Sequence, residues 1–182
     1  MLGQLVVQYA RTSGAATIIA VDTAPARLEL ASRHGATHTL ELPVDQAREP
    51  IEQITGGELA HVVFDMTGAA PVQAHCHHLL RHFGRLVLIG DTGTPERQGL
   101  SSAFMLKNLR IIGAHQLGAA HEPYWKHRQL GELFLTLLTQ GRLNVRDLIT
   151  HRYPAAQAGE AYDMLLTRRG DAMGVILDFN DV

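Results

Sequence analysis

Short apolar runs alternate along this chain with segments in which apolar residues recur at helical spacing. Residues 17–21 are β-branched or small and run directly into Asp22, which predicts a buried parallel strand. Ahead of them, the apolar positions within residues 2–10 predict an amphipathic helix that opens at Gly3. A carboxylate at the end of such a strand lies where open α/β sheets bind their ligands.

The same alternation continues through the middle of the chain. Further strands are predicted at residues 37–40, 60–64, 85–89 and 109–112. The helix predicted between Asp22 and the strand at residues 37–40 has Thr23 as its N-cap, Pro25 in its first turn and Gly35 at its end. Other helices are predicted over residues 45–54, 70–82 and 101–106. This alternation indicates a doubly wound parallel sheet.

The rhythm changes after Gly113. A loop leads to a helix with apolar residues from 130 to 138, then an extended segment at 145–153, an amphipathic helix at 158–166 and a closing strand at 174–179. We do not expect this tail to stack another βαβ unit on the sheet. The chain is therefore predicted to form two structural units, residues 1–115 and residues 116–182.

Composition and charge exclude several classes of protein. A net charge of -2 gives no reason to expect a nucleic-acid partner, and 46% hydrophobic residues are typical of a globular protein. A single cysteine excludes an internal disulfide and a multi-thiolate zinc site within this chain. Apolar runs stay shorter than the roughly 18 residues of a membrane span. We expect a soluble, cytoplasmic protein without a membrane partner.

Several stretches together resemble the coenzyme-binding half of the medium-chain dehydrogenase/reductase superfamily, of the zinc alcohol dehydrogenase type. They are residues 3–10, 21–22 with 27–31, 34–37, 84–90, 148–151, and 160–162 with 174–177. Within the superfamily, the tail is most similar to the group of sorbitol, threonine and bacteriochlorophyllide dehydrogenases. The resemblance implies a Rossmann-type sheet within residues 1–115, which would bind NAD. It also implies that residues 116–182 are a returning segment of the catalytic domain.

The chain also departs from that family. The family's catalytic domain, with its Cys, His and acidic zinc ligands, lies mostly ahead of the cofactor domain and has no counterpart here. The family's first strand and the first two glycines of its dinucleotide fingerprint also have no counterpart here. We therefore expect a Rossmann-type sheet that lacks its central first strand. The sequence is then either a fragment or a gene model with a late start. Zinc is expected only with the missing domain, and the chain alone is expected to be inactive.

Three residues near the N-terminus are candidates for binding the dinucleotide. Asp22, 19 positions after Gly3, would accept both adenosine ribose hydroxyls and repel a 2′-phosphate, which favours NAD over NADP. By resemblance, Arg27 lies beside the adenosine, although it is equally interpreted as a solvated helix residue. Gly3 would let the helix N-terminus approach the pyrophosphate, or else it is simply a glycine near the chain end.

Three further pairs follow predicted strands. By resemblance they line the adenosine, nicotinamide and carboxamide parts of the cofactor cleft: Thr67 with Gly68, Ile89 with Gly90, and Gly113 with Ala114. Each pair is also explained by ordinary turn chemistry.

Histidines are concentrated in one predicted helix. On that helix His75, His78 and His82 would share a face, but no carboxylate stands among them, so no metal site is assigned. His115 and His121 lie nearer the predicted cleft, and without a nearby nucleophile they are interpreted as polar surface. No residue of this chain is predicted to be catalytic.

The resemblance implies the NAD-binding part of a zinc-type alcohol or polyol dehydrogenase, which transfers hydride between a secondary alcohol and nicotinamide. One alternative is a zinc-independent quinone or enoyl reductase of the same superfamily. Another is a non-catalytic dinucleotide-binding fragment. The family commonly dimerises through the strand predicted at residues 109–112, so a homodimer is expected.

Overall fold

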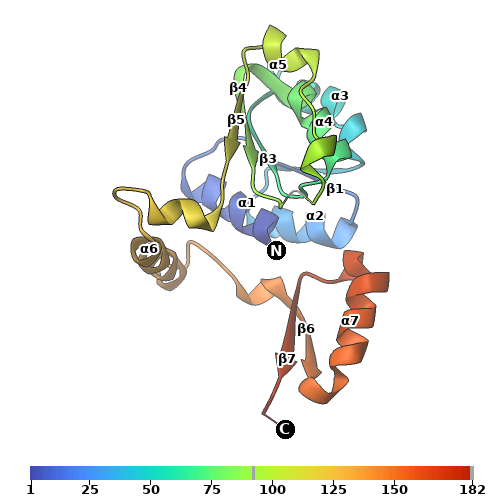
Figure 1. The fold of residues 1–182 in the computed structure, drawn as a ribbon, viewed down its shortest axis with the longest axis vertical. Coiled ribbons are helices and arrows are strands. Elements are labelled where there is room, and N and C mark those ends of the chain that lie inside the picture. The colour runs from blue at the N-terminus through green and yellow to red at the C-terminus, as the bar shows by residue number, and fades with distance from the viewer. Residues whose placement is uncertain (92, 181–182) are drawn as a thin grey trace. The chain divides into compact units, whose positions relative to one another are not determined.

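A computed structural model describes residues 1–91 and 93–180 of the chain. The chain divides into two compact units, one formed by residues 1–41 and 136–182 and the other by residues 42–135 (Figure 1). The boundary after residue 115, predicted between the cofactor-binding and catalytic parts, stays a prediction. The two units are described separately below.

The N-terminal part of the first unit is a helix–strand–helix–strand segment. It consists of α1 (Leu2–Thr12), β1 (Ile19–Asp22), α2 (Pro25–His34) and β2 (His38–Glu41). The strands β1 and β2 are parallel, with Asp22 opposite Glu41. Val7 of α1 packs on Ile18 and on Ala31 of α2, which places the core between the helices and the sheet.

Two expectations for this segment need correction. Residues 19–22 are only half-buried, because β1 belongs to a two-stranded sheet. Thr23 is not the N-cap of α2; Ala24 is. The Asp22 carboxylate accepts a hydrogen bond from the Ala24 backbone N–H at 3.0 Å, so the chain turns one residue further before the helix begins.

The tail of the first unit is a βαβ unit with its own sheet. The strands β6 (Ile149–Pro154) and β7 (Gly174–Asp178) are parallel and joined through α7 (Ala158–Thr167), which lies alongside them (Figure 1). The sequence leads us to expect no further βαβ unit stacked on the sheet, whereas the tail is itself a βαβ unit whose strands form a two-stranded sheet of their own. The sequence does not predict that the tail's strands pair with each other in parallel.

The second unit is built on a three-stranded parallel sheet in the order β3-β4-β5 (Figure 1). Its elements are α3 (Arg48–Ile54), β3 (Ala60–Asp65), α4 (Ala70–Leu79), β4 (Leu80–Leu88), α5 (Ser102–Leu106) and β5 (Arg110–Gly113). Cys76 of α4 packs with Leu80, Leu86 and Leu109 in the core.

The junction of α4 and β4 differs from the prediction of one helix over residues 70–82. The helix ends at Leu79, and Leu80 already belongs to the strand, where it pairs with Ala60 before a register shift. The Lys107 ammonium donates hydrogen bonds to the carbonyls of His78 and Leu80 at this end, and Arg48 also donates to the His78 carbonyl. These cations satisfy carbonyls that a helix terminus leaves free.

The longest helix, α6 (His127–Thr139), has 13 residues and ends before Gly141, whose positive φ of 68° stops it. Short 3-10 helices complete the chain: η1 (Val44–Gln46), η2 (Pro95–Arg97), η3 (Gln116–Ala120), η4 (Arg146–Leu148), η5 (Ala155–Gln157) and η6 (Arg169–Asp171). Within residues 1–91 and 93–180, no helix has the length and apolar character needed to span a membrane.

The sheets agree with the expectation of a Rossmann-type sheet without its first strand. In that strand order the first strand lies between the strands that correspond to β1 and β3. In the described parts of the chain, β1 pairs with β2 alone, and β3 pairs with β4 alone.

Candidate functional site

Asp22 is held in a fixed direction at the carboxyl end of β1. Its Oδ1 accepts the hydrogen bond from Ala24, and its Oδ2 lies 3.7 Å from Nη1 of Arg27. The two charged side chains are 33% and 32% exposed, so both remain open to a ligand. Arg27 is therefore turned toward Asp22 rather than pointing only into solvent.

Buried glutamines of α1 fix the elements that carry these residues. Gln4 donates a hydrogen bond to the Arg27 carbonyl at 2.8 Å, and its Oε1 lies 3.1 Å from Nδ1 of His34. Gln8 binds the backbone N–H and carbonyl of Asn144 at 2.6 and 2.9 Å. Gly3 lies within the first turn of α1, so its backbone is held by the same helix.

His34 closes this polar network on its other side. Its Nε2 lies 3.8 Å from Oδ2 of Asp147, and burial lowers the pKa of the imidazole against the opposing effect of that carboxylate. The sequence reasoning did not identify Gln4, Gln8 or His34, because it followed apolar spacing and these are polar residues on buried helix faces.

In the second unit, Asp65 organises two turns at the carboxyl end of the sheet. Only 2% of this residue is exposed, and its Oδ1 accepts hydrogen bonds from Thr67 N at 2.8 Å and Thr67 Oγ1 at 2.7 Å. Its main-chain carbonyl accepts from the N–H groups of Ile89 and Gly90, each at 3.0 Å. Within the described residues, its Oδ2 has no hydrogen-bond partner.

The two turns touch each other through glycines. A Cβ atom on Gly68 would overlap the carbonyl of Asp91, and one on Gly90 would overlap the backbone of Thr67 and Gly68. Gly68 also has a positive φ of 64°. Both glycines are therefore required by the contact between the turns, whatever ligand they meet. The structure brings together four of the predicted cofactor residues: Thr67, Gly68, Ile89 and Gly90.

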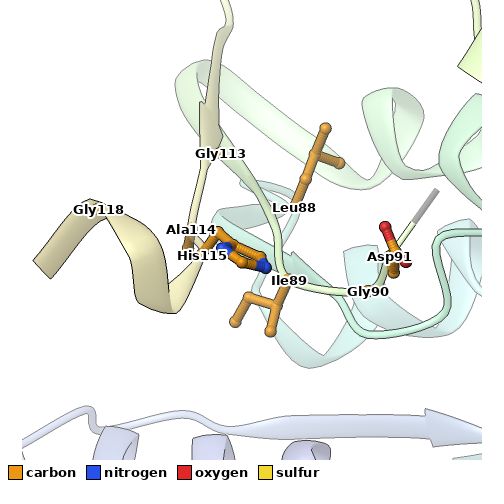
Figure 2. A pocket seen from close by; sticks show the side chains of 8 residues that line it. All are labelled: Leu88, Ile89, Gly90, Asp91, Gly113, Ala114, His115 and Gly118. Atoms are coloured by element: carbon orange, nitrogen blue, oxygen red, sulfur yellow. The ribbon is translucent and has the colours of Figure 1, made fainter. Parts of the chain in front are cut away.

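An open hollow of about 530 Å³ lies beside these turns (Figure 2). Its lining residues come from the ends of β4 and β5 and from η3: Leu88, Ile89, Gly90, Asp91, Gly113, Ala114, His115 and Gly118. The Ala114 N–H donates to the Leu88 carbonyl at 2.9 Å, which holds the two strand ends together. Four predicted residues thus share one cavity, whereas Thr67 and Gly68 are not in its lining.

The sequence places His115 near the predicted cleft but assigns neither His115 nor Asp91 a part in it. His115 is exposed, as expected of polar surface, and it also lines the hollow, where Figure 2 shows its ring beside Ile89. Its position directly after Gly113 and Ala114, two predicted cofactor residues, was the available signal. His121 is exposed at the end of η3 and is not among the lining residues.

The histidine-rich segment, residues 75–82, contains buried core residues and the end of α4. His77 is fully buried against Gln73 and Phe104, and burial lowers its pKa, with a smaller contribution from His78. His82 lies in β4, so the shared helical face with His75 and His78 does not form.

A zinc ion does not fit the residues described. Throughout residues 1–91 and 93–180, no three His, Cys, Asp or Glu side chains are grouped as a metal would require. Cys76 is buried, and burial together with Asp65 raises the pKa of its thiol to about 12. A thiolate is the form that binds zinc, so this cysteine is a poor ligand.

Comparison with known proteins gives consistent relatives. The chain is 30% identical over 181 residues to an uncharacterized zinc-type alcohol dehydrogenase-like protein of Escherichia coli, and 27% identical over 178 residues to a sorbitol dehydrogenase of Halalkalibacterium halodurans. These alignments cover 99% and 97% of this chain and 48% of each relative. The chain thus spans about half the length of the curated relatives it matches.

A solved structure shows the same fold. Benzyl alcohol dehydrogenase from Acinetobacter calcoaceticus matches with a TM-score of 0.81 at 22% identity, over 96% of this chain and 46% of that one. The profile of the family described as zinc-binding dehydrogenase matches residues 2–127, which is most of the chain. The protein therefore belongs to the zinc-binding dehydrogenase family, within the medium-chain dehydrogenase/reductase superfamily that its sequence resembles.

Proposed function

We propose that this chain is the NAD-binding part of a zinc-type alcohol or polyol dehydrogenase, which transfers hydride between a secondary alcohol and nicotinamide. Family membership supports the reaction class, and the relatives include a sorbitol dehydrogenase. The proposed dinucleotide-binding residues are Gly3, Asp22, Arg27, Thr67, Gly68, Ile89, Gly90, Gly113 and Ala114. In this proposal residues 1–115 bind the cofactor and residues 116–182 belong to the catalytic domain.

The observation that carries the proposal is the geometry of Asp22. A carboxylate at the end of the strand after the first helix is the group that accepts ribose hydroxyls in dinucleotide-binding folds. The bond from Ala24 N–H fixes one oxygen, the second lies beside Arg27, and the side chain as a whole remains one-third exposed. A surface ion pair at 3.7 Å is weak, so the carboxylate keeps its capacity to bind hydroxyls.

The fold alone does not select between the two dinucleotides. A zinc-binding dehydrogenase of Sinorhizobium meliloti with the same fold, 20% identical with a TM-score of 0.73, was solved bound to NADP. The choice for this chain therefore rests on Asp22, which would repel a 2′-phosphate, against Arg27, which would attract one. We propose that Asp22 prevails, because its side chain lies at the strand end itself.

The hollow at the ends of β4 and β5 suits the nicotinamide half of the cofactor. Its wall combines apolar side chains of Leu88 and Ile89 with the exposed backbone of Gly90 and Gly113. When bound, the nicotinamide supplies the carbon that accepts or releases hydride. These residues would hold the ring and limit the access of water to one side. Zinc has no fitting ligands among them, so they are given no part in polarising the alcohol.

Calorimetry with NAD and NADP on the intact chain tests the proposal. We expect tighter binding of NAD, and Asp22→Ala should weaken NAD binding about ten- to hundredfold, because a hydrogen bond to a charged group contributes about 1.5–3 kcal/mol. Binding of NADP should improve, since Arg27 then faces the 2′-phosphate alone. The matched control is Glu29→Ala, which removes an exposed acid from α2, the helix that carries Arg27. Equal affinities in the unmodified chain would contradict the assignment.

A further inference from the structure

His115 is exposed, and it also lines the hollow at the end of β5. It follows Gly113 and Ala114 at the end of β5 and lines the 530 Å³ hollow together with Ile89 and Asp91. Figure 2 shows the imidazole beside the Ile89 side chain, between the ends of the two strands. The ring therefore faces the same space as the proposed nicotinamide-binding residues.

One hydrogen bond determines which ring nitrogen carries the hydrogen. His115 is the N-cap of η3, and its Nδ1 accepts a hydrogen bond from the Leu117 backbone N–H at 3.2 Å. An accepting Nδ1 is unprotonated, so in the neutral ring the hydrogen is on Nε2. The cap thus fixes the tautomer and leaves Nε2–H as a donor.

The other lining residues define what this donor would meet. Among the eight residues of the hollow, His115 is the one whose side chain carries an N–H group; the rest are apolar, glycine or the acid Asp91. Asp91 also lines the hollow, and its carboxylate disfavours an anionic ligand. A neutral carbonyl or hydroxyl oxygen is therefore the best partner for Nε2–H.

We infer that His115 is a specificity-determining residue whose Nε2–H donates to a neutral oxygen of the bound ligand. The inference rests on the proposed function. Two groups present this chemistry: the carboxamide oxygen of nicotinamide and a hydroxyl of the alcohol substrate. Capping alone would make His115 replaceable by serine, which is a preferred N-cap residue. His115→Ser therefore separates the cap from the donor.

The experiment measures binding of NAD, and of sorbitol in the presence of NAD, to the unmodified chain and to His115→Ser. A single neutral hydrogen bond contributes about 0.5–1.5 kcal/mol, so the affinity for its partner should fall roughly two- to twelvefold. A loss for NAD identifies the carboxamide, and a loss for sorbitol alone identifies the hydroxyl. His121→Ser, the same change directly after η3 and outside the lining of the hollow, should alter neither.

Nitrogen NMR of the unmodified chain gives a test that needs no variant. We expect His115 in the Nε2–H form without ligand, and a shift of its Nε2 signal when NAD or sorbitol is added. Binding of NAD with no response at Nε2 and unchanged affinities in His115→Ser would overturn this inference and leave the proposed function standing. Failure of the unmodified chain to bind NAD would overturn the proposed function, and this inference with it.

Discussion

At the scale of single residues, the functional candidates differ in how visible they are in a sequence. Asp22 was predictable because a lone acid follows an apolar run, and the structure places it at the end of β1. Asp65 follows a similar run, but its importance depends on bonds to Thr67 and to the distant Gly90. The proposed role of His115 depends on a cavity that the ends of two strands form. Such contacts join residues whose separation along the chain follows neither the helix period nor the strand period, so the sequence pattern does not predict them.

Replacing Asp65 tests how strongly it holds the two turns. Asp65→Ala leaves the Thr67 N–H and hydroxyl without their acceptor, so we expect unfolding to become easier by about 1–3 kcal/mol. Asp65→Asn keeps an acceptor oxygen and should cost less. Urea denaturation followed by circular dichroism measures both. Equal stability of the alanine and asparagine variants would show that the bonds to Thr67 contribute little.

Two buried histidines and one half-buried histidine predict a dependence of stability on pH. Burial lowers the pKa values of His34, His77 and His78 below the ordinary 6.5 in the folded chain. The unfolded chain therefore binds protons more readily, and stability should fall as the pH drops below about 6.5. We expect a lower urea midpoint at pH 5.5 than at pH 7.5. His77→Gln should reduce this difference and the exposed His121→Gln should not; a pH-independent midpoint would contradict the prediction.

At the scale of elements, most helices and strands were predictable, because glycines mark their ends. The helix α2 ends at Gly35 and α6 ends before Gly141, both with positive φ. The junction of α4 and β4 was not predictable, because Leu79 and Leu80 are both buried leucines with no breaking residue between them. Pairing with Ala60 and the cation of Lys107 decide where the helix stops.

Two glycine substitutions test the role of conformation at helix positions. Gly35 has a φ of 113°, and an added Cβ would overlap the Arg11 side chain, so Gly35→Ala should destabilise the chain by about 1–2 kcal/mol. Gly159 lies within α7 with open space around its Cβ position in the described structure, so Gly159→Ala should stabilise it by about 0.5–1 kcal/mol. Thermal unfolding of both variants should show shifts of opposite sign; shifts of the same sign would contradict this account.

At the scale of the whole molecule, the parallel strands agree with the α/β fold expected from the sequence, and they are divided among three sheets. What the sequence could not predict is how its two ends join. Gln8 and Asn144 are 136 positions apart, and the bonds between them link a side chain to the main chain. The main-chain N–H and carbonyl of Asn144 are the same in almost every residue, so the amino-acid sequence does not indicate this contact.

The edge strand β5 gives a prediction about association. It lies at one end of the β3-β4-β5 order, and Ile112 in it is 41% exposed. Unpaired strand edges promote association, and an edge lysine opposes it. We expect light scattering to show a dimer at micromolar concentration and a monomer for Ile112→Lys. Leu117→Lys, at an exposed position outside the strand, should remain dimeric. A monomeric unmodified chain with intact circular dichroism would contradict this prediction.

The construction of the first unit from residues 1–41 and 136–182 determines the order in which the chain can fold during its synthesis. Ribosomes add about 5–20 residues per second, so Gln8 waits roughly 7–27 s before Asn144 is made. The complete sequence of the second unit is available earlier. Until Asn144 is made, the Gln8 side chain lacks the backbone groups that it binds in the folded chain. Completion of the first unit around Gln8 is therefore expected to follow the folding of the second unit.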